Sequence, residues 1–343
     1  IVESPAKVKT INKILGSRYK VTSSMGHLID LPKSTLGVDL EKSFEPKLIV
    51  VRTKQKVLSK LKKEAEGKTE IYFATDPDRE GEAIGWNLVP HLGVDKKIYR
   101  VVFHEITKEA VLRAFKEKHQ FDAKKINAQN ARRILDRIVG YMISPILWKK
   151  VGSRLSAGRV QSVALRLIVD RERQIQKFVP VEYWQISVML QKDGVTGTLH
   201  AQLEKIDGEK ADLKTAAEAN AVAQALGEKL FRVSGVSTRE VKRNALPPFI
   251  TSTLQQEAFS KLGFNAQRTM MVAQELYEGA EVGEEDPVGL ITYMRTDSVN
   301  IANEALDRVR DFIAQEYGKE YLPEVPNKFK SKKMAQEAHE AIR

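Results

Sequence analysis

The chain has 343 residues, of which 42% are hydrophobic and none is cysteine, and its formal net charge is +11. That length and composition suffice for about two to three globular domains, and they exclude disulfides and thiolate metal sites within the sequence. The charge favours a polyanionic partner, either nucleic acid or an anionic membrane surface. No run approaches the roughly 18 to 20 apolar residues of a membrane span, and no signal peptide is visible, so we expect a cytoplasmic protein.

Residues 1 to about 122 predict alternating strands and helices. The expected strands lie at 71–74 and 100–103, and the expected helices at 81–88 and 108–118. This order predicts a parallel or mostly parallel α/β sheet. Because ligands gather at the carboxyl ends of strands in such sheets, Asp76 and Asp78 are candidate site residues.

The rest of the chain predicts two further kinds of structure. Residues 123–180 are expected to be wholly helical, and the period changes to two between about 181 and 246, which predicts a β-rich module. Its expected strands are 183–190, 196–203 and 231–236, and helical patterns return at 253–262, 266–278, 302–317 and from Lys333 to the end.

Three carboxylates alternate in the stretch Asp76-Pro77-Asp78-Arg79-Glu80. In an extended segment they project to one side and can converge on a hard cation such as Mg²⁺, whereas an exposed acidic turn is the alternative. Glu3, expected at the end of the first strand, can stand near them and act as a general acid toward a leaving hydroxyl. Lys7 can hold a phosphate.

Tyr293 follows a short apolar run, with Arg295 two residues on and Asp297 four residues on. A phenol has an unperturbed pKa near 10 and is a poor nucleophile at about neutral pH. A neighbouring guanidinium can favour the phenolate and neutralise a phosphate under attack. The alternative is a half-buried strand tyrosine beside ordinary surface charges.

The stretch Gly67-Lys68-Thr69 is not part of a nucleotide-binding phosphate loop, because Lys62 stands where that loop needs glycine. Phosphodiester chemistry in this chain must therefore conserve bond energy or hydrolyse the bond.

Basic residues at helical spacing mark a candidate nucleic-acid surface. Arg132, Arg133 and Arg137 suit bidentate contact with phosphates or bases, and Asp136 can accept from a base amino group. The stretch from Ser156 to Gln161 predicts a helix start whose amides, with Arg159, can receive a phosphate. For His27 and His339, a structural role and contact with phosphate both remain open.

Five stretches together resemble the type IA DNA topoisomerases, and in particular the bacterial topoisomerase I branch. They are IVESPAKVKT at 1–10, ATDPDREGEAI at 74–84, residues 127–148, LSAGRVQSVALR at 155–166 and LITYMRTDS at 290–298. The resemblance implies a multidomain α/β plus α fold. Its expected parts are a Rossmann-like Toprim domain (1–122), a helical DNA-binding domain (123–180), a β-rich arch (181–247) and a helical gate domain bearing the tyrosine (248–343).

The resemblance also implies an activity. It is the ATP-independent, Mg²⁺-dependent relaxation of negatively supercoiled DNA by a nucleoid-associated monomer, through cleavage of a single-stranded segment and a 5′-phosphotyrosyl intermediate. On this hypothesis Tyr293 attacks, Arg295 stabilises the phosphate, Glu3 serves the leaving 3′ oxygen and Lys7 assists. Asp76, Asp78 and Glu80 are expected to hold Mg²⁺.

The remaining implied roles concern the DNA strand. Arg133, Asp136 and Arg137 are expected to line a pocket that reads a base upstream of the cut, and the strand contacts are Arg132, Ser156, Arg159, Gln161 and His339. Asp297 is expected to orient Arg295 or His339, and His27 to support the site.

Chains of this family normally continue further, and many end in zinc ribbons. We therefore expect these residues to be the front half of the core, starting after the natural N-terminus, with weak or no activity when isolated. A Toprim-type metal-dependent nuclease or primase-like enzyme, which would not use Tyr293, is the main alternative. A non-enzymatic single-strand binder is the second.

Overall fold

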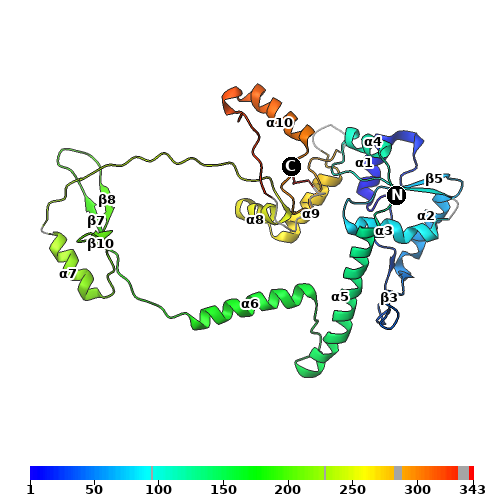
Figure 1. Ribbon diagram of the computed structural model, residues 1–343, viewed down its shortest axis with the longest axis horizontal. Helices are drawn as coiled ribbons and strands as arrows, with labels where there is room; N and C mark the ends of the chain where they lie inside the picture. The colour runs from blue at the N-terminus through cyan, green and yellow to red at the C-terminus, as the bar shows by residue number, and fades with distance from the viewer. Residues whose placement is uncertain (94–95, 228, 282–287, 331–339) are drawn as a thin grey trace. The chain divides into compact units, whose positions relative to one another are not determined.

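The computed structural model describes residues 1–343 except 94–95, 228, 282–287 and 331–339 (Figure 1). The chain divides into two compact units. The first contains residues 1–159 and 245–343, and the second contains residues 160–244.

The first unit begins with a parallel β-α-β arrangement, which confirms the predicted α/β pattern. Strand β5 (Glu70–Phe73) pairs in parallel with β6 (Lys97–Arg100), and helix α3 (Arg79–Leu88) connects them. Residues 1 and 2 extend the arrangement, because the Ala74 N–H donates to the Ile1 carbonyl at 2.9 Å. The strand predicted at 100–103 is wrong in its bounds, because β6 covers 97–100. Its pairing with β5 ends at Phe73, before the chain enters the acidic loop, residues 76–80.

Helices and short antiparallel pairs complete this part. Helix α1 (Pro5–Leu15) starts with the N-cap Ser4, whose hydroxyl accepts from the Lys7 N–H at 3.3 Å, and with proline at its first position. The other elements are α2 (Gln55–Ala65), α4 (Lys108–Lys116), β1 (Ile29–Asp30) with β4 (Ile49–Val50), and β2 (Val38–Asp39) with β3 (Glu45–Pro46). Short 3₁₀ turns lie at 16–18, 52–54, 89–91 and 319–321.

One hydrophobic core joins the beginning of the chain to its last third. Val2, Ile11 and Val101 pack in the same buried cluster as Tyr277 and Tyr293. A second cluster, which includes Leu28 and Phe73, packs around β5 and α3. The segment that carries Tyr293 is therefore fixed against the α/β part by burial of apolar surface.

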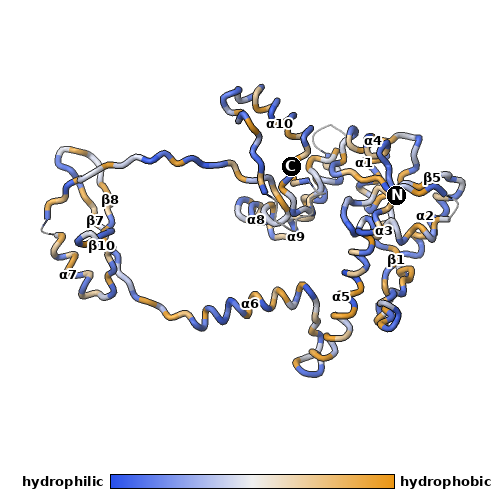
Figure 2. The backbone as a smooth tube through the Cα atoms, viewed as in Figure 1, coloured by the Kyte–Doolittle hydropathy of each residue, from blue (hydrophilic) through white to orange (hydrophobic). Residues whose placement is uncertain are grey.

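The region predicted to be wholly helical contains two helices with a break. Helix α5 (Ala123–Lys150) begins at the N-cap Asp122 and α6 (Arg159–Lys177) follows a loop. The helix start predicted at Ser156 is wrong, because in this loop the Ala157 N–H donates to the Ser144 hydroxyl at 3.1 Å. Apolar and polar residues alternate along α6, none of whose residues is buried (Figure 2).

In the described part of residues 181–247, which were predicted to be β-rich, the structure has two short antiparallel strand pairs and one helix. Strands β7 (Ser187–Leu190) and β8 (Leu199–Gln202) form one antiparallel pair, and β9 (Lys205–Ile206) and β10 (Glu209–Lys210) form another. Helix α7 (Ala216–Gly227) was not predicted. The strand predicted at 231–236 is wrong, since these residues are exposed and pair with no other strand in the described part of the chain.

The last third is helical. Helix α9 (Ala266–Glu278) matches its predicted bounds, and α8 (Thr251–Leu262) and α10 (Asn303–Glu316) differ from theirs by a residue or two. Of the helix predicted from Lys333 onward, residues 333–339 lie outside the described residues. Residues 340–343 are not helical, and Ile342 instead forms a β-bridge with Phe249.

Candidate active site

Tyr293 lies in a segment without helix or strand that packs against the α/β core. Its N–H donates to the His104 carbonyl at 2.8 Å, and its ring meets the Tyr277 ring edge-to-face at 5.2 Å between centroids. The side chain is almost completely buried. Its hydroxyl donates to Oδ2 of Asp78 at 2.7 Å. The fold therefore brings the candidate nucleophile to the acidic loop, 215 residues away in the sequence.

The surroundings of Tyr293 keep its phenol protonated. Burial raises the pKa of Tyr293, and the negative charges of Asp76 and Asp78 raise it further. Arg295 lowers this pKa, as the sequence predicted, but by less than the other effects raise it. Arg295 therefore favours the phenolate, but it does not offset burial and the neighbouring carboxylates, because its guanidinium is exposed while the phenol is buried.

Glu3 adjoins the acidic loop, as predicted. Its Oε1 accepts from the Asp76 N–H at 2.7 Å. Burial, followed by the charge of Asp76, raises the pKa of Glu3 to about 7, and Lys7 opposes this shift. A carboxyl group with a pKa near neutrality can both give and take a proton.

Lys7 is completely buried in α1 and forms an ion pair with Asp76. Its Nζ also lies 5.2 Å from the centroid of the Tyr277 ring. Lys7, which was predicted to hold a phosphate, therefore lies in the site, where it is paired with the Asp76 carboxylate.

Asp78 and Glu80 belong to the start of α3. Asp78 is the N-cap, and its Oδ1 accepts from the Gly81 N–H at 2.8 Å. Glu80 lies in the first turn, where its Oε2 shares a hydrogen bond with His27 Nε2 at 3.1 Å and accepts from Gln129 Nε2 at 3.2 Å. The hydrogen bond with His27 is the largest cause that lowers the pKa of Glu80. The extended geometry predicted for the three carboxylates is wrong, because the helix begins between them.

The carboxylates have the donor chemistry of a site for a hard divalent cation, because Asp76, Asp78 and Glu3 gather negative charge at one place. They are not yet arranged as a metal site. Within the residues that the structure describes, no group of three or more Asp, Glu or His side chains is close enough to hold an ion. Asp76 and Asp78 at present contact Lys7 and Tyr293.

A groove of about 700 Å³ runs beside the acidic loop. Its lining includes Asp78, Glu80, Arg132, Arg295 and Asp297, with Arg79, Thr251, Ser252 and Gln255 among the other residues. Arg295 and Asp297 are both exposed here. Sequence reasoning missed Arg79, which stands inside the acidic motif, and the residues at the start of α8, which carry no recognisable motif. The groove places guanidinium groups next to the carboxylate that Tyr293 contacts.

A second pocket, of about 280 Å³, lies between α5 and β1. It is lined by His27, Asp30, Glu80, Gln129, Arg132, Arg133 and Asp136, among others. Arg133 Nε donates to Asp30 Oδ1 at 2.9 Å, and Arg159 Nη2 donates to Asp136 Oδ2 at 2.7 Å. The pairing with Arg159 lowers the pKa of Asp136.

Arg137 does not line this pocket, contrary to the prediction. Its buried guanidinium donates to the backbone carbonyls of Leu31, Pro32 and Thr35. These hydrogen bonds fix the loop against α5. Of the other predicted DNA contacts, Ser156 is exposed in the loop before α6 and Gln161 is exposed on α6 in the second unit. His339 lies outside the described residues.

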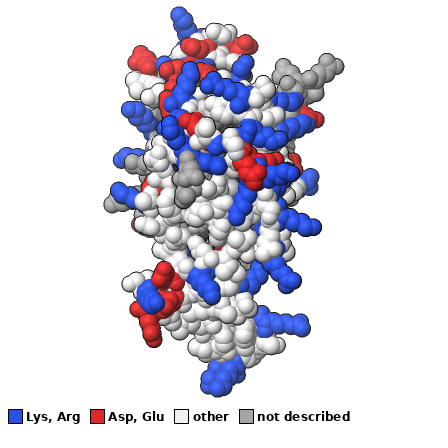
Figure 3. All heavy atoms as spheres, turned by 90° about the vertical axis from the view of Figure 1, so that its right-hand side faces the viewer, with Lys and Arg blue, Asp and Glu red and all other residues white. Residues whose placement is uncertain are grey.

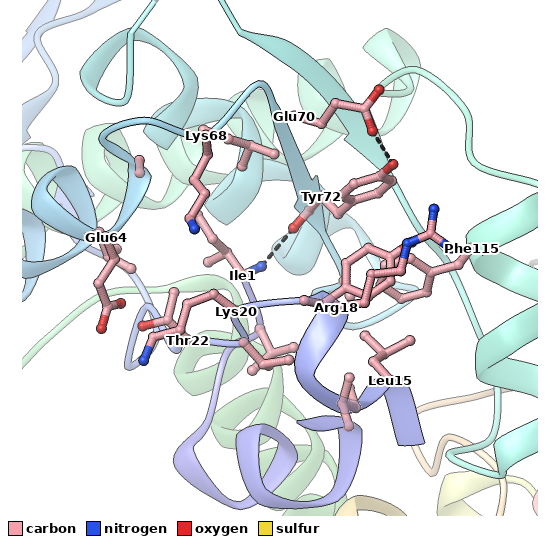
Figure 4. Close-up of a pocket in the computed structure, with 18 of the residues that line it drawn as sticks. Ile1, Leu15, Arg18, Lys20, Thr22, Glu64, Lys68, Glu70, Tyr72 and Phe115 are labelled. Carbon is pink, nitrogen blue, oxygen red and sulfur yellow. Dashed lines mark hydrogen bonds between the residues drawn. The ribbon is translucent and has the colours of Figure 1, made fainter. Parts of the chain in front are cut away.

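Lys and Arg side chains are spread over the face shown in Figure 3, whereas acidic side chains form a few smaller groups. A separate hollow of about 310 Å³ lies beside Ile1, whose ammonium donates to the Tyr72 carbonyl at 2.6 Å (Figure 4). None of the predicted site residues lines that hollow. Among the described residues, no helix is both long and apolar enough to span a membrane.

Two family models match consecutive segments of the chain. The family model described as the Toprim domain matches residues 1–106, and the one described as DNA topoisomerase matches residues 120–343. The structure of full-length topoisomerase I from Thermotoga maritima is similar, with 45% sequence identity and a TM-score of 0.80. That match covers 100% of this chain and 54% of the Thermotoga chain, so this chain spans about half the length of its relative.

Proposed function

Because the chain belongs to the bacterial type IA DNA topoisomerase family, we propose that it relaxes negatively supercoiled DNA by transient cleavage of one strand. The observation that carries the proposal is the 2.7 Å hydrogen bond from the Tyr293 hydroxyl to Asp78. It joins a phenol to a carboxylate cluster beside a groove lined by arginines. A covalent nucleophile, proton-handling groups and phosphate-binding cations are thus neighbours.

In the proposed step, Tyr293 Oη attacks phosphorus and the bond to the 3′ oxygen breaks. The phenol proton leaves to the carboxylate cluster, where Asp78 accepts its hydrogen bond, and Glu3 supplies a proton to the leaving oxygen. Arg295 neutralises charge on the phosphate. Lys7, which forms an ion pair with Asp76, assists in this. The products are a 5′-phosphotyrosyl ester and a free 3′ hydroxyl. Because the ester conserves the bond energy, religation needs no ATP.

We propose that Asp76, Asp78 and Glu80 hold a divalent cation, with Mg²⁺ favoured by the hard carboxylate oxygens. Divalent-metal binding is associated with Toprim domains, and the accumulation of charge around Glu3 supports such a site. When bound, the cation would offset the negative charge of the DNA phosphates near these carboxylates. His27 would then keep Glu80 oriented through their hydrogen bond.

We further propose that the pocket between α5 and β1 receives one base of a single-stranded segment, with Arg133 and Asp136 as the polar contacts. Arg132, which lines both this pocket and the groove, would contact the intervening phosphate. Asp297 would orient Arg295. Ser156, Arg159, Gln161 and His339 remain proposed strand contacts, and the protein is proposed to act as a monomer.

The test is to mix the full-length protein, rather than these residues alone, with end-labelled single-stranded DNA and Mg²⁺, quench with detergent, and look for DNA attached to Tyr293 by mass spectrometry. Tyr293→Phe should abolish the adduct. Tyr277→Phe is the matched control, because that neighbouring hydroxyl makes only a 3.5 Å bond to the Phe103 carbonyl, and it should retain the adduct. Cleavage without an adduct would instead indicate a metal-dependent nuclease, and binding without cleavage a DNA-binding protein.

The metal is tested separately with a chelator. With the full-length protein, we expect chelation to stop relaxation of supercoiled plasmid and added Mg²⁺ to restore it, while single-stranded DNA still binds. Full relaxation in excess chelator would contradict a role for Asp76, Asp78 and Glu80 in metal binding.

A further inference from the structure

A completely buried ion pair lies behind the carboxylate cluster. Arg100, at the end of β6, and Glu82, in α3, are 0% and 1% exposed. Arg100 Nε donates to Glu82 Oε2 at 2.7 Å. Neither residue belongs to the chemistry proposed above. A buried ion pair is weak evidence for stability as such, so its other partners indicate what it does.

The remaining Arg100 donors hold the end of the strand that leads into the acidic loop. Its Nη1 donates to the carbonyls of Phe73 and Thr75, each at 3.0 Å, and of Val101 at 2.7 Å. Its Nη2 donates to the Asp76 carbonyl at 2.6 Å. The backbone on both sides of Thr75, including that of the candidate ligand Asp76, is thus tied to one guanidinium.

The second oxygen of Glu82 points to a different element. Its Oε1 accepts from the Asp122 N–H at 2.6 Å, and Asp122 is the N-cap of α5. The Asp122 side chain in turn accepts from the Lys124 N–H at 2.8 Å. Glu82 therefore connects the first turn of α5 to the strand end before Asp76, and each of its two oxygens has one partner.

We propose that Glu82 is a positioning residue that couples the acidic loop to α5, so that metal bound at the loop and DNA bound along α5 strengthen each other. This inference rests on the proposed function, because α5 carries Arg132, Arg133 and Asp136. A coupling of this kind is reciprocal: Mg²⁺ raises the affinity for DNA by the same factor by which DNA raises the affinity for Mg²⁺.

Replacing Glu82 by glutamine separates this role from simple packing. The carboxylate accepts at both oxygens, whereas the amide has one acceptor oxygen and an NH₂ group that only donates. In the same shape, glutamine can satisfy either Arg100 or the Asp122 N–H, but not both. Glu82→Gln therefore keeps the shape of the side chain while breaking one arm of the connection.

The experiment measures binding of a fluorescent single-stranded oligonucleotide by anisotropy, with and without Mg²⁺. All proteins carry Tyr293→Phe so that no cleavage intervenes. We expect Mg²⁺ to tighten binding at least about fivefold in this background, within the usual range of such couplings, and Glu82→Gln to bring that factor close to one. Glu64→Gln on α2 is the matched control and should keep the full factor.

Hydrogen–deuterium exchange supplies a structural readout. Amide exchange at 122–126 should accelerate in Glu82→Gln and stay slow in Glu64→Gln. The exchange rates in the rest of the α/β core should be the same in both variants. If Glu82→Gln does not fold, Glu82→Asp takes its place. It keeps the charge that compensates Arg100, but its side chain is one methylene shorter and cannot reach both donors.

Two results would overturn the coupling: a Mg²⁺ factor of one in the Tyr293→Phe background, or an undiminished factor in the Glu82 variant. Either result would leave the proposed function standing if the unsubstituted protein forms the Tyr293 adduct. Failure of that adduct with intact DNA binding would instead remove the proposed function, so the two failures are distinguishable.

Discussion

Gly81 shows how closely single residues define the acidic loop. A Cβ atom at this position would lie 2.3 Å from the Asp76 carbonyl oxygen and 2.8 Å from the Asp76 nitrogen. Both atoms are backbone and cannot turn aside. The Gly81 carbonyl also accepts from the Thr75 hydroxyl at 2.7 Å. Only glycine lets the loop fold back on itself so that Asp78 can cap α3.

We therefore predict that Gly81→Ala lowers the free energy of unfolding by about 1 to 3 kcal/mol, the usual range for overpacking. Adduct formation should fall as well, because the shifted backbone carries Asp76. Gly152→Ala is the control, since an added Cβ there meets nothing within 4 Å. Denaturant unfolding and adduct yield measure the two effects, and equal behaviour of the two variants would contradict the prediction.

A substitution at Tyr293 can separate the contribution of its hydroxyl to stability from its contribution to the reaction. Tyr293→Phe removes one hydrogen bond to Asp78, which keeps its second bond to the Gly81 N–H. Asp78 also lines the groove, where water can replace the phenol. We predict a change of no more than about 1 kcal/mol in the free energy of unfolding, together with complete loss of the adduct. A large loss of stability, seen by denaturant unfolding, would show that the hydroxyl is structural.

At the scale of elements, charged side chains join α4 to α10, and the residues just before α4 to the last residues of the described chain. Arg113 donates to both oxygens of Glu304 at 3.0 Å, and Arg308 donates to Glu109 at 2.7 Å. Arg343 pairs with Glu105 at 3.0 Å. On each helix the paired residues are four positions apart, so the two helices present complementary charges. Exposed pairs of this kind are weak singly and sensitive to salt.

Exchanging one of these pairs tests the contact between the helices. Glu109→Arg alone and Arg308→Glu alone should each lower the thermal unfolding temperature at low salt, because each places like charges together. The double exchange should restore most of the loss, and all differences should shrink in high salt. The same exchange at Asp212 and Lys214, an exposed pair in the second unit, is the control. Additive losses in the double variant would rule out direct pairing in solution.

At the scale of the whole molecule, the formal net charge of +11 favours binding of a polyanion. The two cavities that contain predicted site residues both include Arg132, and the larger one adds Arg79 and Arg295. Each phosphate neutralised by such a group releases counterions, so the affinity should fall steeply with salt.

For single-stranded DNA we predict a loss of about 10- to 100-fold in affinity between roughly 50 and 200 mM salt, which corresponds to a few phosphate contacts. In a plot of the logarithm of the binding constant against the logarithm of the salt concentration, Arg132→Gln should reduce the magnitude of the slope by roughly 0.7, the contribution of one phosphate. Lys60→Gln on α2 should leave it unchanged. Fluorescence anisotropy across a salt series measures both slopes, and an unaltered slope for Arg132→Gln would remove this residue from the DNA contact.

The sequence by itself predicted the features that depend on neighbouring residues. Periodicity and turn signals predicted the β-α-β order, α9, and the hairpin of β7 and β8. The motifs around Asp76 and Tyr293 indicated the family that the comparisons support. These features follow from local hydrogen bonding and from which face of an element is apolar, and a short stretch of chain contains that information.

Only the tertiary structure decided which side chains meet. Helix α3 begins at Arg79, directly after its N-cap Asp78, so the carboxylates do not share one extended face. The packing of residues 31–35 on α5 engages Arg137. The contact of Tyr293 with Asp78 and the position of Glu82 between Arg100 and α5 join segments far apart in sequence. Such contacts depend on how complete surfaces pack and on which buried polar groups must find partners, and no local pattern specifies either.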